Sequence, residues 1–199
     1  GCGAIGQALM RAADSGKLNV AVVGVTSRNE HRAHEFLGGL DNPPPYLDRQ
    51  ELVSRSDLVV ETAGGHIVAE LAKETFAAGK DLMVISIGAL LENPGIIEEA
   101  RETGCRLLAP SGAIAGLDGI KSACAGWVDH VTMVSRKPPI GLEGAPHLVE
   151  NGISLEGLEE EMEVFSGTAR EAVKGFPANL NVSAAVSLAG VGPDRTQVK

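Results

Sequence analysis

The chain opens with three glycines spaced as Gly1-x-Gly3-x-x-Gly6, and this spacing constrains the fold more than any other feature. In such a loop the first glycine permits a tight turn, the second lets a ligand approach the backbone, and the third lets a helix pack closely. A helical pattern over 4–13 begins within the loop, so the helix N-terminus offers free N–H groups to an anion. These features predict a site for the pyrophosphate of a dinucleotide, formed by Gly1, Gly3, Ala4, Ile5 and Gly6.

Short apolar runs alternate with helical patterns over the first two-thirds of the chain, which is typical of a parallel α/β fold. The runs are rich in Val, Ile and Leu without strict alternation, as expected for strands covered on both faces. We therefore predict a Rossmann-like doubly wound parallel sheet. Its expected strands are 19–25, 57–61, 81–87 and 106–109, and its expected helices are 4–13, 30–37, 67–78 and 94–103.

The pattern changes after about residue 129. We expect a strand at 130–136, a stretch rich in glycine and proline, a strand at 161–165, and helices at 168–174 and 179–188. Residues 1–128 are thus predicted to form a dinucleotide-binding domain, and 129–199 to begin an α+β substrate or dimerisation domain. Because the glycine motif normally follows a central strand, we expect that strand to precede Gly1 and the second domain to continue past Lys199.

Composition excludes several classes of function. A net charge of −9 with 3% aromatic residues argues against nucleic-acid binding. The longest apolar runs, such as 82–87, are too short to span a membrane. The three cysteines, Cys2, Cys105 and Cys124, have no Cys-x-x-Cys spacing, which favours reduced thiols in the cytoplasm. No metal site is predicted.

The end of the second expected strand bears on the choice of cofactor. An acidic residue usually binds the ribose of NAD about 20 residues after the glycine motif, but this region reads Val25-Thr26-Ser27-Arg28-Asn29. Ser27 and Arg28 suit a 2′-phosphate, which favours NADP. Arg28 could instead be a solvated charge at a helix start, so both NAD and NADP stay open.

Small residues occupy the ends of three expected strands, at 62–66, 86–89 and 109–114. Strand ends on the carboxyl side of such a sheet line the ligand crevice, and small side chains leave room for a cofactor. We expect Ala63 and Gly64 to contact it. His66 lies at the same turn and is interpreted as a helix-entry residue.

Two longer motifs carry a resemblance to a known family. They are Pro-Ser-Gly-Ala-Ile-Ala-Gly-Leu-Asp at 110–118 and Phe-Pro-Ala-Asn-Leu-Asn-Val at 176–182. Together with Lys137-Pro138-Pro139 and the glycine loop, they resemble L-aspartate dehydrogenases over essentially the whole chain. The resemblance implies NAD(P)-dependent conversion of L-aspartate to iminoaspartate, which hydrolyses to oxaloacetate and ammonia.

The resemblance also implies roles for single residues. Ala113 and Asn179 match positions that contact the nicotinamide cofactor, although Asn179 also suits a helix N-cap. The family's catalytic histidine falls beyond Lys199, so we expect no catalytic residue in this chain and little turnover by it alone. Lys137 and Arg136 are either ligands for the substrate carboxylates or surface charges. A homodimer and a place in NAD biosynthesis are further implications.

Two alternatives stay open. The chain could belong to a related amino-acid-pathway reductase resembling homoserine dehydrogenase or dihydrodipicolinate reductase, which substrate profiling would distinguish. It could also be a cofactor-binding protein without enzymatic activity that acts through partner contacts.

Overall fold

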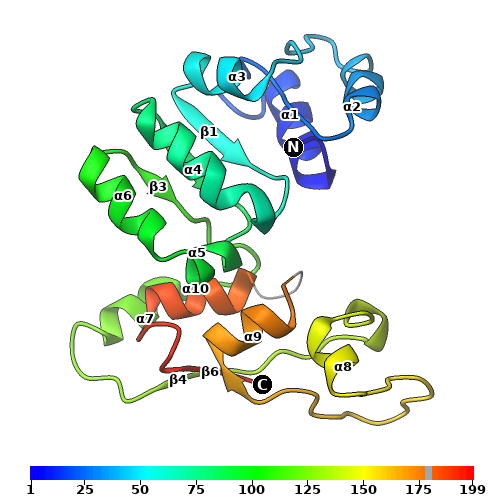
Figure 1. Ribbon diagram of the computed structural model, residues 1–199, viewed down its shortest axis with the longest axis vertical. Helices are drawn as coiled ribbons and strands as arrows, with labels where there is room; N and C mark the ends of the chain where they lie inside the picture. The colour runs from blue at the N-terminus through cyan, green and yellow to red at the C-terminus, as the bar shows by residue number, and fades with distance from the viewer. Residues whose placement is uncertain (178–180) are drawn as a thin grey trace. The chain divides into compact units, whose positions relative to one another are not determined.

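The computed structural model describes residues 1–177 and 181–199, which form two compact units (Figure 1). The first unit comprises Gly1–Ser86 and Pro94–Leu108, and the second comprises Ile87–Asn93 and Ala109–Lys199. The division after residue 128 stays a prediction, which limited proteolysis would test. No helix among the described residues is long and apolar enough to cross a membrane.

A parallel three-stranded sheet organises the first unit, with the order β1 (Leu58–Glu61), β2 (Asp81–Val84), β3 (Leu107–Leu108). Leu58 lies opposite Asp81, and Leu82 lies opposite Leu107. The connections are helices α4 (Val68–Ala77) and α6 (Gly95–Thr103), which lie side by side along the sheet (Figure 1). This parallel α/β architecture confirms the predicted Rossmann-like fold class.

Helix α4 shows why the sequence folds this way. Its buried residues recur at helical spacing and form one largely apolar buried face, namely Val68, Leu71, Ala72, Thr75 and Phe76. Phe76 is 2% exposed and Leu82 of β2 is fully buried. Burying each such side chain stabilises the fold by about 1.5–3 kcal/mol.

An exposed ion pair joins the starts of β2 and β3. Asp81 accepts hydrogen bonds from Arg106 through both carboxylate oxygens, from the backbone N–H at 2.7 Å and from Nε at 2.8 Å. The bond from the Arg106 side chain is the main reason that the pKa of Asp81 lies below its usual value. The pair thus favours the parallel register of these two strands.

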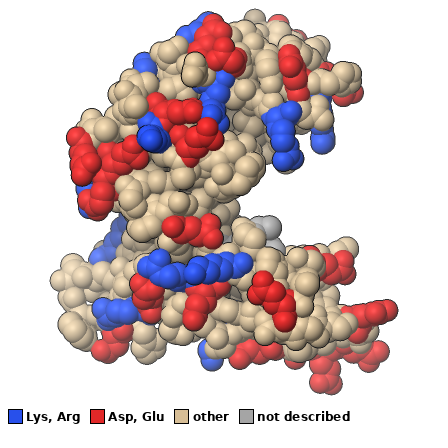
Figure 2. Space-filling view, in the orientation of Figure 1, with Lys and Arg blue, Asp and Glu red and all other residues tan. Residues whose placement is uncertain are grey.

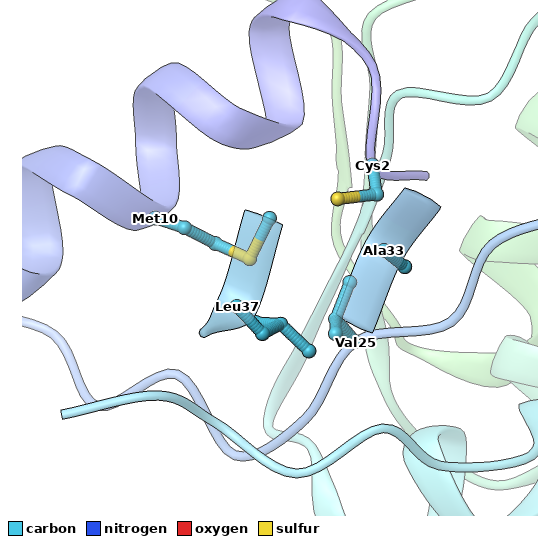
Figure 3. Packing of buried hydrophobic residues seen from close by; sticks show 5 residues of the cluster. All are labelled: Cys2, Met10, Val25, Ala33 and Leu37. Carbon is cyan, nitrogen blue, oxygen red and sulfur yellow. The ribbon is translucent and has the colours of Figure 1, made fainter. Parts of the chain in front are cut away.

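The other regular elements of the first unit are helices: α1 (Ala4–Asp14), α2 (Glu30–Leu37), α3 (Arg49–Arg55) and the short 3₁₀ turn η1 (Gly65–Ile67). Figure 3 shows the apolar cluster that joins the first two helices to the glycine loop. The cluster consists of Cys2, Met10, Val25, Ala33 and Leu37. The predicted helices at 4–13 and 30–37 are confirmed, and α3 was not predicted.

The strand predicted at 19–25 is wrong. Only Val25 makes a β-bridge, to Tyr46, and residues 19–24 are irregular. A segment becomes a strand only when a neighbour satisfies its N–H and C=O groups, and the described part of the chain places no strand beside 19–24. The strands predicted at 81–87 and 106–109 form over shorter ranges.

A mixed sheet organises the second unit. Strand β6 (Thr196–Val198) runs parallel to β4 (Val131–Met133) and antiparallel to β5 (Gly167–Thr168). Its helices are α5 (Gly88–Glu92), α7 (Leu117–Ala123), α8 (Pro146–Glu150), α9 (Ala169–Gly175) and α10 (Asn181–Ala189), with a 3₁₀ turn η2 (Pro139–Gly141). Helix α10 contacts α5, α7 and α9, and most of its residues are buried, so it forms the centre of this unit.

The strand predicted at 161–165 is also wrong. This segment belongs to an irregular, acidic stretch from Glu156 to Glu163, and Figure 2 shows acidic side chains gathered along that part of the second unit. Glu161 forms an ion pair with Arg136. Phe165 packs edge-on against Phe176, with ring centroids 5.6 Å apart. The apolar end of this segment is therefore a packed aromatic ring in a loop, and β6 pairs with 167–168 instead.

Candidate dinucleotide-binding site

The three glycines of the opening loop have different surroundings. A Cβ atom on Gly1 would lie 2.6 Å from the carbonyl oxygen of Thr62, and one on Gly6 would lie 2.1 Å from the carbonyl oxygen of Gly1. A Cβ on Gly3 would meet nothing within 4 Å. The outer glycines therefore permit close packing of the chain on itself, whereas Gly3 faces open space into which a ligand can move.

The N-terminus of α1 begins at this open position. Gly3 is the N-cap and offers no side chain to the first-turn N–H groups, and the first turn carries no acidic residue. Those N–H groups and the positive end of the helix dipole are suited to phosphate oxygens. Ala4 and Ile5 are exposed beside them, with Ile5 49% exposed. The loop thus fits the pyrophosphate that the sequence predicts.

The end of β1 lies against the glycine loop. Thr62 donates a hydrogen bond of 2.9 Å from Oγ1 to the carbonyl oxygen of Gly1. Ala63 is exposed, and Gly64 adopts φ 114°, a conformation that favours glycine. The structure thus brings the loop 62–64 together with Gly1 and Gly6, although contact with a cofactor stays a prediction.

Ser27 and Arg28 follow the Val25 bridge and precede α2. The Tyr46 hydroxyl donates to the Ser27 carbonyl oxygen at 2.7 Å and lies 3.4 Å from the Ser27 nitrogen. Asn29 caps α2 by accepting from the Arg32 nitrogen at 2.9 Å, and Arg28 is exposed. The segment is therefore fixed through its backbone while the Arg28 side chain remains available to solvent.

The structure reveals a residue that the sequence analysis did not single out. Glu61, the last residue of β1, is only 1% exposed and accepts hydrogen bonds from the backbone nitrogens of Ala63 and Gly64 at 2.6 and 2.7 Å. Its signal in the sequence is a charged residue closing the apolar run Leu58-Val59-Val60. Glu61 lies on the buried face of β1 with Val59, so its carboxylate needs local donors, and the following strand-end loop supplies them.

The remaining predicted cofactor residues belong to the second half of the chain. Ala113 lies in an exposed turn of the second unit, after Gly112 at φ 66°. Asn179 lies outside the described residues. In the same motif, Asn181 accepts a hydrogen bond of 3.2 Å from the Gly88 nitrogen, which fixes the start of α5.

The histidines and the charged candidate residues lie on the surface or in packing contacts. His34 faces Glu30 on α2 at 3.4 Å, and the His147 ring packs on Phe165 and Phe176 with centroids 5.1 and 5.4 Å apart. His66 is exposed in η1. Lys137 lines a small pocket with Phe165, Phe176 and Lys199, among others. Within residues 1–177 and 181–199, no group of three His, Cys, Asp or Glu side chains could hold a metal ion.

Known proteins resemble this chain along its whole length. A family model described as the NAD-binding domain of homoserine dehydrogenase matches residues 1–110, and one described as the C-terminal part of aspartate dehydrogenase matches 118–199. The L-aspartate dehydrogenase of Methanosarcina mazei is 45% identical, and the alignment covers all of this chain and 75% of the relative. The chain belongs to the L-aspartate dehydrogenase family.

Further relatives agree with this assignment to the L-aspartate dehydrogenase family. The L-aspartate dehydrogenase of Bradyrhizobium diazoefficiens is 44% identical over all of this chain and 71% of its own length. A crystal structure of aspartate dehydrogenase from Thermotoga maritima matches with a TM-score of 0.65 and 25% identity, covering 90% of this chain and 77% of that one. The match at 118–199 separates the chain from the homoserine-dehydrogenase-like alternative, since its second part resembles aspartate dehydrogenase.

Proposed function

We propose that this member of the L-aspartate dehydrogenase family oxidises L-aspartate to iminoaspartate, which hydrolyses to oxaloacetate and ammonia, with a nicotinamide dinucleotide as hydride acceptor. The observation that carries the proposal is identity of 42–45% to several L-aspartate dehydrogenases over the whole chain. The glycine loop supports it, because its geometry suits a dinucleotide pyrophosphate.

Each part of the proposed site has a distinct role. Gly1, Gly3, Ala4, Ile5 and Gly6 would hold the pyrophosphate through close backbone approach and the first-turn amides of α1. Ala63 and Gly64, together with Ala113 and Asn179, would contact the rest of the dinucleotide. When bound, the cofactor supplies the hydride-accepting ring, and this chain supplies binding and orientation. Positioning of this kind can provide on the order of 7–11 kcal/mol in favourable intramolecular reactions.

We assign the acid–base step to none of the five histidines in this chain. His34 faces Glu30, and the His147 ring packs against two phenylalanine rings. His31 is exposed on α2, and His66 is exposed in η1. His130 directly precedes β4 and is likewise exposed. The step is proposed to use a histidine that the family carries beyond the position of Lys199.

Reductive amination tests the proposed reaction. The full-length protein is mixed with oxaloacetate, ammonium and NADH or NADPH, and oxidation of the cofactor is followed by absorbance. Ammonium-dependent oxidation that is selective for oxaloacetate over other 2-oxo acids is expected. Oxidation without ammonium would indicate a reductase of another class, and cofactor binding without turnover would favour a binding protein.

We propose that NADP binds at least as well as NAD. The support is the absence of an acidic side chain from 26–29 and the exposed guanidinium of Arg28 next to the fixed backbone of Ser27. A charge-assisted contact with a 2′-phosphate is worth about 1.5–3 kcal/mol, or roughly 10- to 150-fold in affinity. Arg28→Ala should therefore weaken NADP binding by about tenfold or more and leave the dissociation constant for NAD nearly unchanged. Equal effects on both cofactors would refute this assignment.

We also propose that two copies associate in solution. Several large apolar side chains of the second unit are exposed, including Trp127 at 83%, Ile140 at 78% and Val149 at 69%. The proposal rests on the resemblance to the L-aspartate dehydrogenase family, and a partner would cover side chains of this kind. The molar mass from light scattering tests the dimer, and a concentration-independent monomer would contradict it.

A further inference from the structure

Glu61 is a fully buried carboxylate beside the glycine loop of the proposed cofactor site. It closes β1, and only 1% of its surface is exposed. Transfer of a carboxylate from water into a protein interior is costly unless hydrogen bonds replace its hydration. The identity of its partners therefore shows what this residue stabilises.

Four donors surround the carboxylate. Oε1 accepts from the backbone nitrogens of Ala63 and Gly64 at 2.6 and 2.7 Å and from Oγ of Ser86 at 3.2 Å. Oε2 accepts from the backbone nitrogen of Ser86 at 2.9 Å. All four contacts run toward the carboxylate, which matches the acceptor-only character of its ionised form.

These bonds join three segments of the chain. The residues 62–64 follow β1, and Ser86 follows β2. Thr62, next to Glu61 in the chain, donates a hydrogen bond of 2.9 Å to the carbonyl oxygen of Gly1. Because both backbone amides of 63–64 turn inward to Glu61, the loop presents the Ala63 side chain outward. One side chain thus fixes two strand ends and, through Thr62, the glycine loop.

We propose that Glu61 is a positioning residue for the nicotinamide dinucleotide, an inference that rests on the proposed function. Its carboxylate keeps 62–64 and Ser86 at the spacing that the glycine loop requires. Glutamine cannot replace it, since an amide has a single acceptor oxygen. Its NH₂ group would then face either the Ser86 nitrogen or the amides of 63–64, donor against donor.

Glu61→Gln in the full-length protein tests this role. Dissociation constants for NAD and NADP are measured by calorimetric titration, and amide hydrogen exchange is measured at 63, 64 and 86. Cofactor affinity is expected to fall about tenfold or more, as for loss of hydrogen bonds to a charged group. Exchange is expected to accelerate at these three amides and to remain unchanged in α10 of the second unit.

Glu74→Gln is the matched control. Glu74 is a partly buried carboxylate of the same unit, on α4, and forms an ion pair of 2.7 Å with Arg49. Its neutralisation removes one charge and one ion pair from the first unit. It should leave both cofactor dissociation constants and the exchange at 63, 64 and 86 as in the unchanged protein.

Several results would overturn the inference. Unchanged cofactor affinity in Glu61→Gln would do so, as would equal losses in Glu61→Gln and Glu74→Gln. If Glu61→Gln does not fold, Ser86→Ala removes only the Oγ donor and should weaken cofactor binding by about two- to tenfold, and no change would again refute the role. Because these measurements contain no aspartate, a failure of the proposed reaction is distinguishable from a failure of this inference.

Discussion

The hydroxyl of Tyr46 lies 2.7 Å from the carbonyl oxygen of Ser27, to which it donates a hydrogen bond across 19 residues of chain. The β-bridge between Val25 and Tyr46 places the two segments side by side. The Tyr46 ring also contacts the ring of His34, with centroids 5.1 Å apart. The residue that precedes Arg28 is therefore held by a side chain from a distant loop.

Tyr46→Phe should retain the ring contact and lose the hydrogen bond. We expect the free energy of unfolding to fall by about 1 kcal/mol, measured by urea denaturation. Because Ser27 and Arg28 are proposed to bind the 2′-phosphate, NADP affinity should fall more than NAD affinity in calorimetric titration. A uniform loss for both cofactors would contradict a role for this segment in cofactor choice.

Gly3→Ala and Gly6→Ala should separate binding from folding. A methyl group on Gly3 meets open space, so this variant should lose only the roughly 1 kcal/mol or less that alanine costs at an N-cap, while its cofactor affinity falls. A methyl group on Gly6 would lie 2.1 Å from the Gly1 carbonyl oxygen, and the forced shift should cost about 1–3 kcal/mol of stability. Thermal unfolding and cofactor titration of both variants provide the measurement. Normal binding by Gly3→Ala would argue against close approach of the pyrophosphate there.

Asn181→Ala should destabilise the second unit. The Asn181 Oδ1 atom accepts from the nitrogen of buried Gly88 at the start of α5. Loss of this acceptor should cost about 1–3 kcal/mol in chemical denaturation. Ser122→Ala, at an exposed position on α7, is the control and should change stability by less than about 0.5 kcal/mol. Equal effects would indicate that the Asn181 bond contributes little.

Asp81→Asn should make stability less dependent on acid pH. The Arg106 side chain lowers the pKa of Asp81 in the folded protein, so the pair stabilises the fold above the unfolded-state pKa of about 3.9. That contribution is lost as the pH falls through the lower, folded-state pKa. The variant should therefore be less stable than the unchanged protein at pH 7, and the difference should shrink below about pH 4. A difference that is constant from pH 7 to pH 2 would exclude this linkage.

Local sequence patterns predicted those elements of the first unit whose backbone hydrogen bonds form within a helix or with a neighbouring strand of the chain. The strand at 57–61 and the helices at 30–37 and 67–78 depend on apolar spacing and on caps such as Asn29, all of which are visible in the sequence. The segment 19–25 has the same apolar character but lacks a neighbouring strand among the described residues. Strand formation depends on the partner as well as on the segment, so this prediction failed.

The candidate site was predictable only in part. The spacing of Gly1, Gly3 and Gly6 identified the loop, because glycine is needed where backbone atoms approach closely. The pairing of Tyr46 with Ser27 and of Glu61 with Ser86 joins residues 19 and 25 positions apart. The periodicity of the sequence does not predict such pairs, because the two residues come together only when the chain folds. The short helices α5, α7 and α8 were missed because one or two turns leave little periodic signal.

Cys2 lies between the first two glycines of the loop, and its sulfur points into the cluster with Met10, Val25 and Leu37 (Figure 3). It is 6% exposed, whereas Cys105 and Cys124 are half-buried. An alkylating reagent can therefore reach Cys2 only when the start of α1 separates from α2. The alkylation rate of Cys2 thus reports how often the glycine loop opens. A bound dinucleotide should lower that rate without contacting the thiol.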